Sequence, residues 1–153
     1  MRLARRLGTP ELIALAGAVL LAAGLFVPWY DTNAGNRNAT IAGTHGSASG
    51  WQVHLVLRWL LLAAALAPPI LAWIMVREHE LSWPRGEMTA VVAMIALVLV
   101  LYVGVIDRPG QPKGEISLAY GWFAAALGCV LMCAGGAARA GTTDRPRKPP
   151  GVL

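Results

Sequence analysis

The chain of 153 residues has the length of one soluble domain, but its composition excludes an ordinary soluble protein. Apolar residues make up 56% of it and charged residues only 14%, whereas an average soluble domain has about 25% charged residues. The net charge of +5 does not indicate nucleic-acid binding, because the basic residues flank apolar segments. We therefore expect a multi-pass protein of the plasma (inner) membrane that contacts the lipid bilayer and no nucleic acid.

Four apolar segments are long enough to cross a bilayer. A hydrocarbon core about 30 Å thick requires roughly 20 apolar residues in a helix. Such segments lie at about 11–30, 53–76, 88–106 and 117–138. We expect an all-α fold, an integral membrane four-helix bundle, over residues 10–139. The first segment follows a basic N-terminus, as in a signal peptide, but it lacks a convincing cleavage motif and is interpreted as a retained helix.

The basic residues predict that both termini face the cytoplasm, because Lys and Arg concentrate in short cytoplasmic loops. This orientation places nine basic residues inside and three outside. The inner ones are Arg2, Arg5, Arg6, Arg77, Arg85, Arg139, Arg145, Arg147 and Lys148, and the outer ones are Arg37, Arg108 and Lys113. Aromatic rings favour the headgroup level. Those expected at the outer ends are Trp29, Tyr30, Trp51, Trp59, Tyr102, Tyr120 and Trp122, and those at the inner end are Trp73 and Trp83.

Three polar stretches lie outside the expected spans. Residues 1–9 are expected to form a basic cytoplasmic arm, and residues 140–153 a disordered, basic, proline-rich cytoplasmic tail. The outer loop at 31–50 is rich in Gly, Asn, Ser and Thr and has few residues able to form a core. We expect this loop to be mobile or to fold as turns on the outer surface.

Two adjacent prolines, Pro68 and Pro69, lie in the middle of the second span. Proline removes a backbone donor and pushes away the carbonyl four residues earlier, so we expect a kink. In lipid, the freed carbonyls of Ala64 and Ala65 would need another partner. The kink either serves packing alone or lines a functional cavity.

The fourth span carries small residues at intervals of four, including Gly121, Ala125, Cys129 and Cys133. Helices associate in lipid through close contact of small residues, so this ridge should pack against another helix, in the same chain or in a second copy. The two cysteines have Cys-x-x-x-Cys spacing in mid-helix. This pattern favours packing over redox chemistry, because a thiol in an apolar site forms little thiolate.

The outer ends of the spans hold the polar residues that could form a site: His54, Arg58, Asp31 and Asp107. His54 and Arg58 lie one helical turn apart. We expect Arg58 to extend to the headgroups while its stem stays in the apolar layer. Two alternatives remain open: Arg58 pairs with Asp31 or Asp107, or His54 and Arg58 bind an anion or a lipid.

Several strings in the chain resemble a group of small four-helix (tetraspan) membrane proteins abundant in actinobacteria. They are "LFVPWYD", "SGWQVHLVLRWLLL", "DRPG" and "YGWFAAALGCVLMCAGGAAR". The resemblance covers about residues 10–140 and implies a four-helix membrane fold, without an activity to carry over. Many such proteins have an acidic residue early in the second helix, where this chain has Arg58.

The sequence contains no motif for catalysis, for a metal or for a cofactor. The three histidines, His45, His54 and His79, fall on both sides of the expected membrane and cannot share one metal. We expect a non-enzymatic accessory, scaffold or envelope-associated protein, acting as a homo-oligomer or with another membrane protein. The alternative is a binder or passive conduit for a lipid or an amphipathic small molecule near the outer leaflet.

Overall fold

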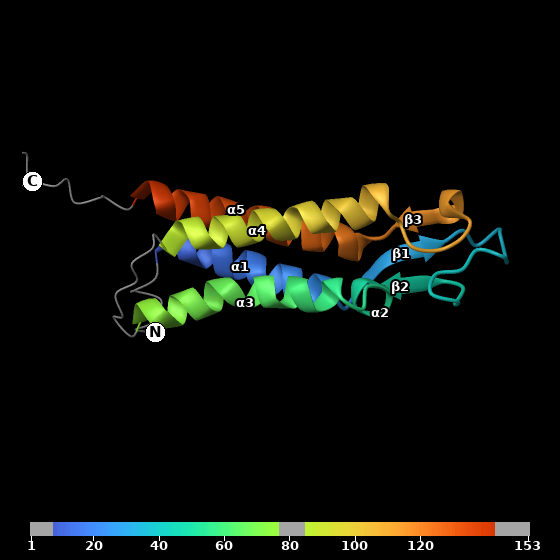
Figure 1. The fold of residues 1–153 in the computed structure, drawn as a ribbon, viewed down its shortest axis with the longest axis horizontal. Coiled ribbons are helices and arrows are strands. Elements are labelled where there is room, and N and C mark those ends of the chain that lie inside the picture. The colour runs from blue at the N-terminus through green and yellow to red at the C-terminus, as the bar shows by residue number, and fades with distance from the viewer. Residues whose placement is uncertain (1–7, 77–84, 143–153) are drawn as a thin grey trace, which may run out of the picture.

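Four long helices run side by side, and a small sheet covers one end of them (Figure 1). This computed structural model describes residues 8–76 and 85–142. Most of the expected basic arm, Arg77, Trp83 and nearly all of the expected tail lie outside these residues. The helices are α1 (Thr9–Gly24), α3 (Leu57–Val76), α4 (Arg85–Leu101) and α5 (Tyr120–Thr142).

Three helical segments of the described chain are long and apolar enough to cross a membrane. They are Leu57–Ile74, Gly86–Ile106 and Tyr120–Gly141. The α1 helix has 16 residues and is the shorter apolar helix. At 1.5 Å per residue it is about 24 Å long.

The α5 helix is the central packing element of the bundle. It packs most extensively against α1 and α4, whereas α3 contacts mainly α1 and has a looser contact with α4. The interior contains Leu21 of α1, Leu61 of α3, Val100 of α4 and Met132 of α5, each fully buried. The bundle is therefore tight around α5 and loose between α3 and α4.

The described chain is mostly helical, as expected, but it is not all-α, because three short strands form an antiparallel sheet at one end of the bundle. They are β1 (Pro28–Thr32), β2 (Ser47–Ser49) and β3 (Ile116–Leu118), in the order β2-β1-β3. Tyr30 faces Ala48 on one side and Leu118 on the other. Strands β1 and β3 overlap the expected ends of the first and fourth spans, and the helices are shorter there: α1 ends at Gly24 and α5 begins at Tyr120.

The outer loop at 31–50 is more ordered than expected. Ile41 and Ala39 are fully buried, and Ala48 is 5% exposed. Thr40 forms an antiparallel bridge with Gln111 of the second outer loop. A few apolar side chains are thus enough to order the loop, because Ile41 and Ala48 join the core of the bundle. We call the sheet and these two loops the cap.

Short helices complete the outer end. A capping box of Ser49 and Gln52 begins α2 (Gly50–Val53). The α4 helix continues into a π-helical turn, η1 (Tyr102–Ile106), and η2 (Lys113–Glu115) is a turn of 3-10 helix that precedes β3. Together these turns bring the second and third spans to the sheet.

Three of the outer aromatics expected at the headgroup level are buried inside the protein. Trp29 and Tyr30 are fully buried, and Trp122 is 7% exposed. The Trp29 indole N–H donates to Gly24 O at 2.7 Å, and that of Trp122 donates to Val100 O at 2.9 Å. They fill the junction between cap and helices, where backbone carbonyls at helix ends accept their N–H groups. The aromatics that do face outward are Trp59, Tyr102 and Tyr120.

Candidate functional site

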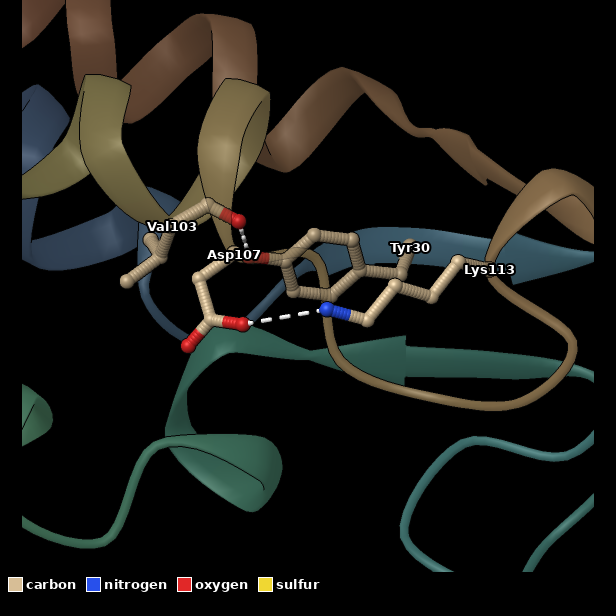
Figure 2. Close-up of polar contacts among 4 residues, drawn as sticks. All are labelled: Tyr30, Val103, Asp107 and Lys113. Carbon is tan, nitrogen blue, oxygen red and sulfur yellow. Dashed lines mark hydrogen bonds and ion pairs between the residues drawn. The ribbon is translucent and has the colours of Figure 1, made fainter.

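A hydrogen-bonded pair, Tyr30 and His54, joins the cap to the π-helical turn. The Tyr30 hydroxyl donates to Val103 O at 3.1 Å, and His54 Nε2 lies 2.9 Å from the same hydroxyl oxygen. The Tyr30 hydroxyl has one proton and donates it to the Val103 carbonyl, so it can only accept a hydrogen bond from His54. His54 Nε2 must therefore carry a proton and act as the donor. Figure 2 shows the Tyr30 ring directed at Val103 with Asp107 beside it.

Burial controls the ionisation of this pair. It lowers the pKa of His54, and the negative charge of Asp107 offsets part of that effect. It also raises the pKa of Tyr30, an effect that Arg108 opposes. Both residues are therefore neutral at neutral pH, as expected for a buried hydrogen-bonded pair.

Arg58, in the first turn of α3, does not join the Tyr30–His54 pair. Its guanidinium stacks on Trp51 and Trp59, at 5.1 and 5.6 Å from the ring centroids, and Nη1 donates to Trp51 O at 3.2 Å. Trp51 in turn stacks on Phe26, just after α1. Arg58 thus faces α1 rather than α4, and the aromatic rings hold it by cation–π attraction.

Within residues 8–76 and 85–142, neither of the two expected acidic partners of Arg58 forms a salt bridge with it. Asp107 lies 3.5 Å from Lys113, in a pair that is about 60% exposed (Figure 2). Asp31 belongs to β1, and its backbone carbonyl accepts a hydrogen bond from Ser117. The structure therefore brings His54 near Asp107 but leaves Arg58 and Asp31 apart from them.

The ridge of small residues on α5 lies at contacts within the chain. Gly121 lies against the backbone of Val27 and Pro28, and Ala125 lies against Gly24. Cys129 is fully buried, and the Cys133 thiol donates to Ala90 O of α4 at 3.7 Å. The ridge thus serves α1 and α4 of the same chain.

The α3 helix continues through both prolines. Pro69 is exposed, while Pro68 is buried and lines a small cavity at the inner end of the bundle. We use "inner" for the end opposite the cap.

An apolar groove between α3 and α4 was not anticipated. Its volume is about 350 Å³, and its lining is entirely apolar: Leu60, Leu61, Ala63, Ala64, Ala67, Val92, Ile95, Ala96 and Leu99. The alanines leave space where the two helices pack loosely. Leu99 lies one helical turn before Val103, so the groove ends about one turn short of the carbonyl that the Tyr30 hydroxyl binds.

An ion pair between a buried carboxylate and a partly exposed arginine was also missed. Glu11 Oε1 lies 2.8 Å from Arg139 Nη1, and the Glu11 side chain is 9% exposed. In the sequence, Glu11 lies in the first turn of an apolar helix. An exposed glutamate is also common at this position. No local signal in the sequence pairs Glu11 with Arg139, because the two residues lie near opposite ends of the chain.

Within the part of the chain that the structure describes, no group of three or more His, Cys, Asp or Glu side chains could hold a metal ion. The sequence matches no protein-family model, and no curated protein or solved structure is significantly similar to it.

Proposed function

We propose that the protein is a non-enzymatic tetraspan protein of the plasma membrane with both termini in the cytoplasm. Three described helices have spanning length, and Leu25–Val27 would extend α1 toward the thickness of the hydrocarbon core. The starts of α1 and α4 and the ends of α3 and α5 share the end opposite the cap (Figure 1). The excess of basic residues at that end supports a cytoplasmic location for it.

In this proposal the protein is an accessory component that holds the apolar chain of a lipid or similar amphiphile. The observation that carries it is the apolar groove between α3 and α4. Its volume of about 350 Å³ falls in the range of small-molecule sites, roughly 300–1,000 Å³. The polar residues beyond its outer end, among them His54 and Asp107, would lie at the level of a headgroup in the outer leaflet.

The same groove suits a scaffold role less well. A partner helix would pack through small residues, and Ala63 and Ala67 provide such a pair on α3. Bulky side chains such as Leu60 and Ile95 line the same groove, and both are more than half exposed. A narrow apolar chain fits between such side chains more readily than a helix does.

Photo-crosslinking tests the groove directly. The full-length protein in membranes would be irradiated with a phospholipid carrying a diazirine in its acyl chain. Adducts should concentrate on the peptides holding Leu60–Ala67 and Val92–Leu99. Adducts spread evenly over all outward-facing helix surfaces would contradict a specific site.

Cysteine labelling tests the orientation independently. In a background of Cys129→Ala and Cys133→Ala, an impermeant maleimide should label Ala34→Cys in intact spheroplasts. Gly141→Cys should react only after the membrane is opened. The reverse pattern would overturn the orientation and place the cap in the cytoplasm.

A further inference from the structure

The inner cavity gathers side chains from all four long helices. Glu11 comes from α1, Pro68 and Ala72 from α3, Thr89 from α4 and Arg139 from α5. The cavity has a volume of about 30 Å³. It shares no lining residue with the groove between α3 and α4, so we treat it apart from the proposed amphiphile site.

The carboxylate of Glu11 is incompletely satisfied in this cavity. Arg139 neutralises its charge at 2.8 Å, but both carboxylate oxygens are buried and neither has a hydrogen-bond partner of suitable direction in the described chain. The short distance and the missing hydrogen bond are compatible, because an ion pair depends on distance and a hydrogen bond also on direction. A buried carboxylate can accept several hydrogen bonds, so the site lacks donors.

Water fits this site better than a cation does. A cavity needs about 10–15 Å³ by this measure to hold one water molecule, so about 30 Å³ accommodates two. A metal cation would lie close to the guanidinium of Arg139, which already neutralises Glu11. Thr89, which is 5% exposed, supplies the one hydroxyl among the described lining residues and can hold a water molecule in place.

We propose that the inner cavity is a hydration site, in which about two water molecules bridge Glu11 to Thr89. The waters complete the hydrogen bonds that the ion pair leaves open. They also couple α1 and α4 to α5 at the inner end of the bundle. The site is thus a water-mediated clamp between helices that otherwise meet through small residues.

Radiolytic hydroxyl footprinting of the full-length protein in lipid nanodiscs tests the proposal, because bound water generates radicals beside buried side chains. Pro68 is buried and lines the cavity, so it should be oxidised in the wild type. Ala72→Leu fills the cavity and should abolish this oxidation. Ala134→Leu, at an exposed position of α5 outside both the cavity and the groove, is the control and should leave it unchanged.

Two further variants test whether the site requires the charge of Glu11 or only its polar side chain. Glu11→Gln keeps an acceptor and should retain the oxidation of Pro68, whereas Glu11→Leu should lose it. No oxidation of Pro68 in the wild type, or equal oxidation in Ala72→Leu, would overturn the proposal. A thermal midpoint raised by NaCl but not by choline chloride, in the wild type but not in Glu11→Gln, would also overturn it by indicating a cation.

Discussion

Gly17 of α1 and Gly128 of α5 lie against each other's backbone. A Cβ atom at Gly17 would lie 2.6 Å from Gly128 O, and one at Gly128 would lie 2.7 Å from Gly17 O. No side chain separates the two helices at this point. The close approach explains why small residues recur along α5, since in lipid such contact is a main source of helix association.

This contact predicts that Gly128→Ala is destabilising. The added methyl would force the backbones apart, at a cost of about 1–3 kcal/mol, which exceeds the gain of up to about 1 kcal/mol in helix propensity. Gly141→Ala is the matched control on the same helix, because nothing lies within 4 Å of its Cβ. Thermal unfolding in detergent should show a lower midpoint for the first variant only.

The buried Tyr30–His54 pair predicts that stability depends on pH. Folding lowers the pKa of His54, so the unfolded chain binds the proton more tightly. The free energy of unfolding should therefore fall as the pH drops below about 6.5 and stay constant above it, as far as His54 is concerned. His54→Gln keeps an N–H donor without titrating, and its unfolding should lose this dependence. A similar slope in the variant would assign the pH effect to another group.

Loss of the Tyr30 hydroxyl should loosen the attachment of the cap to the π-helical turn. Tyr30→Phe leaves Val103 O without this donor and His54 without its acceptor. We expect a loss of about 1–3 kcal/mol, the cost of leaving buried polar groups unpaired. Amide hydrogen exchange should increase in η1 and β1 and remain unchanged at the inner end of α5. Uniformly faster exchange would mean that the pair has no local role.

The cap should depend on Ile41 as a core residue. Ile41→Ala should cost about 2–5 kcal/mol, because the side chain is fully buried. Ile106→Ala is the matched control, since Ile106 is 70% exposed. Limited proteolysis from the outer side should cleave the loop at 31–50 rapidly in the first variant and slowly in the second. Equal cleavage of the two variants would indicate that the loop is mobile and does not depend on Ile41.

The aromatic clamp on Arg58 predicts a difference between arginine and lysine. Arg58→Lys keeps the charge but loses the planar stacking on Trp51 and Trp59, at a cost of about 1 kcal/mol. Arg37→Lys is the control, because Arg37 is exposed in the outer loop. The thermal midpoint should fall only for Arg58→Lys. If both variants keep the wild-type midpoint, Arg58 serves only as a headgroup contact.

The sequence predicted the helical segments because apolar length is a local property that the chain displays directly. It could not predict that Trp29 and Tyr30 are buried. The same aromatic residues mark a membrane interface or the core of a small sheet, and only the pairing of β1 with strands 15 and 84 residues away decides between them. Such pairing depends on contacts far apart in sequence.

The candidate site was harder to predict for the same reason. Glu11 and Arg139 are at opposite ends of the chain, and nothing local to either shows that they meet. The groove between α3 and α4 arises from alanines that resemble ordinary helix formers in the sequence. One alternative had His54 and Arg58, one turn apart on the chain, binding a ligand together, but Arg58 bonds to Trp51 and His54 to Tyr30.

Native mass spectrometry of the protein extracted from membranes tests the central claim most directly. The wild type should retain one tightly bound amphiphile. Ala67→Phe, which fills the groove between α3 and α4, should lose it. Leu66→Phe should keep it, since Leu66 is 50% exposed and does not line the groove. Equal retention of the amphiphile by Ala67→Phe and the wild type would contradict the account.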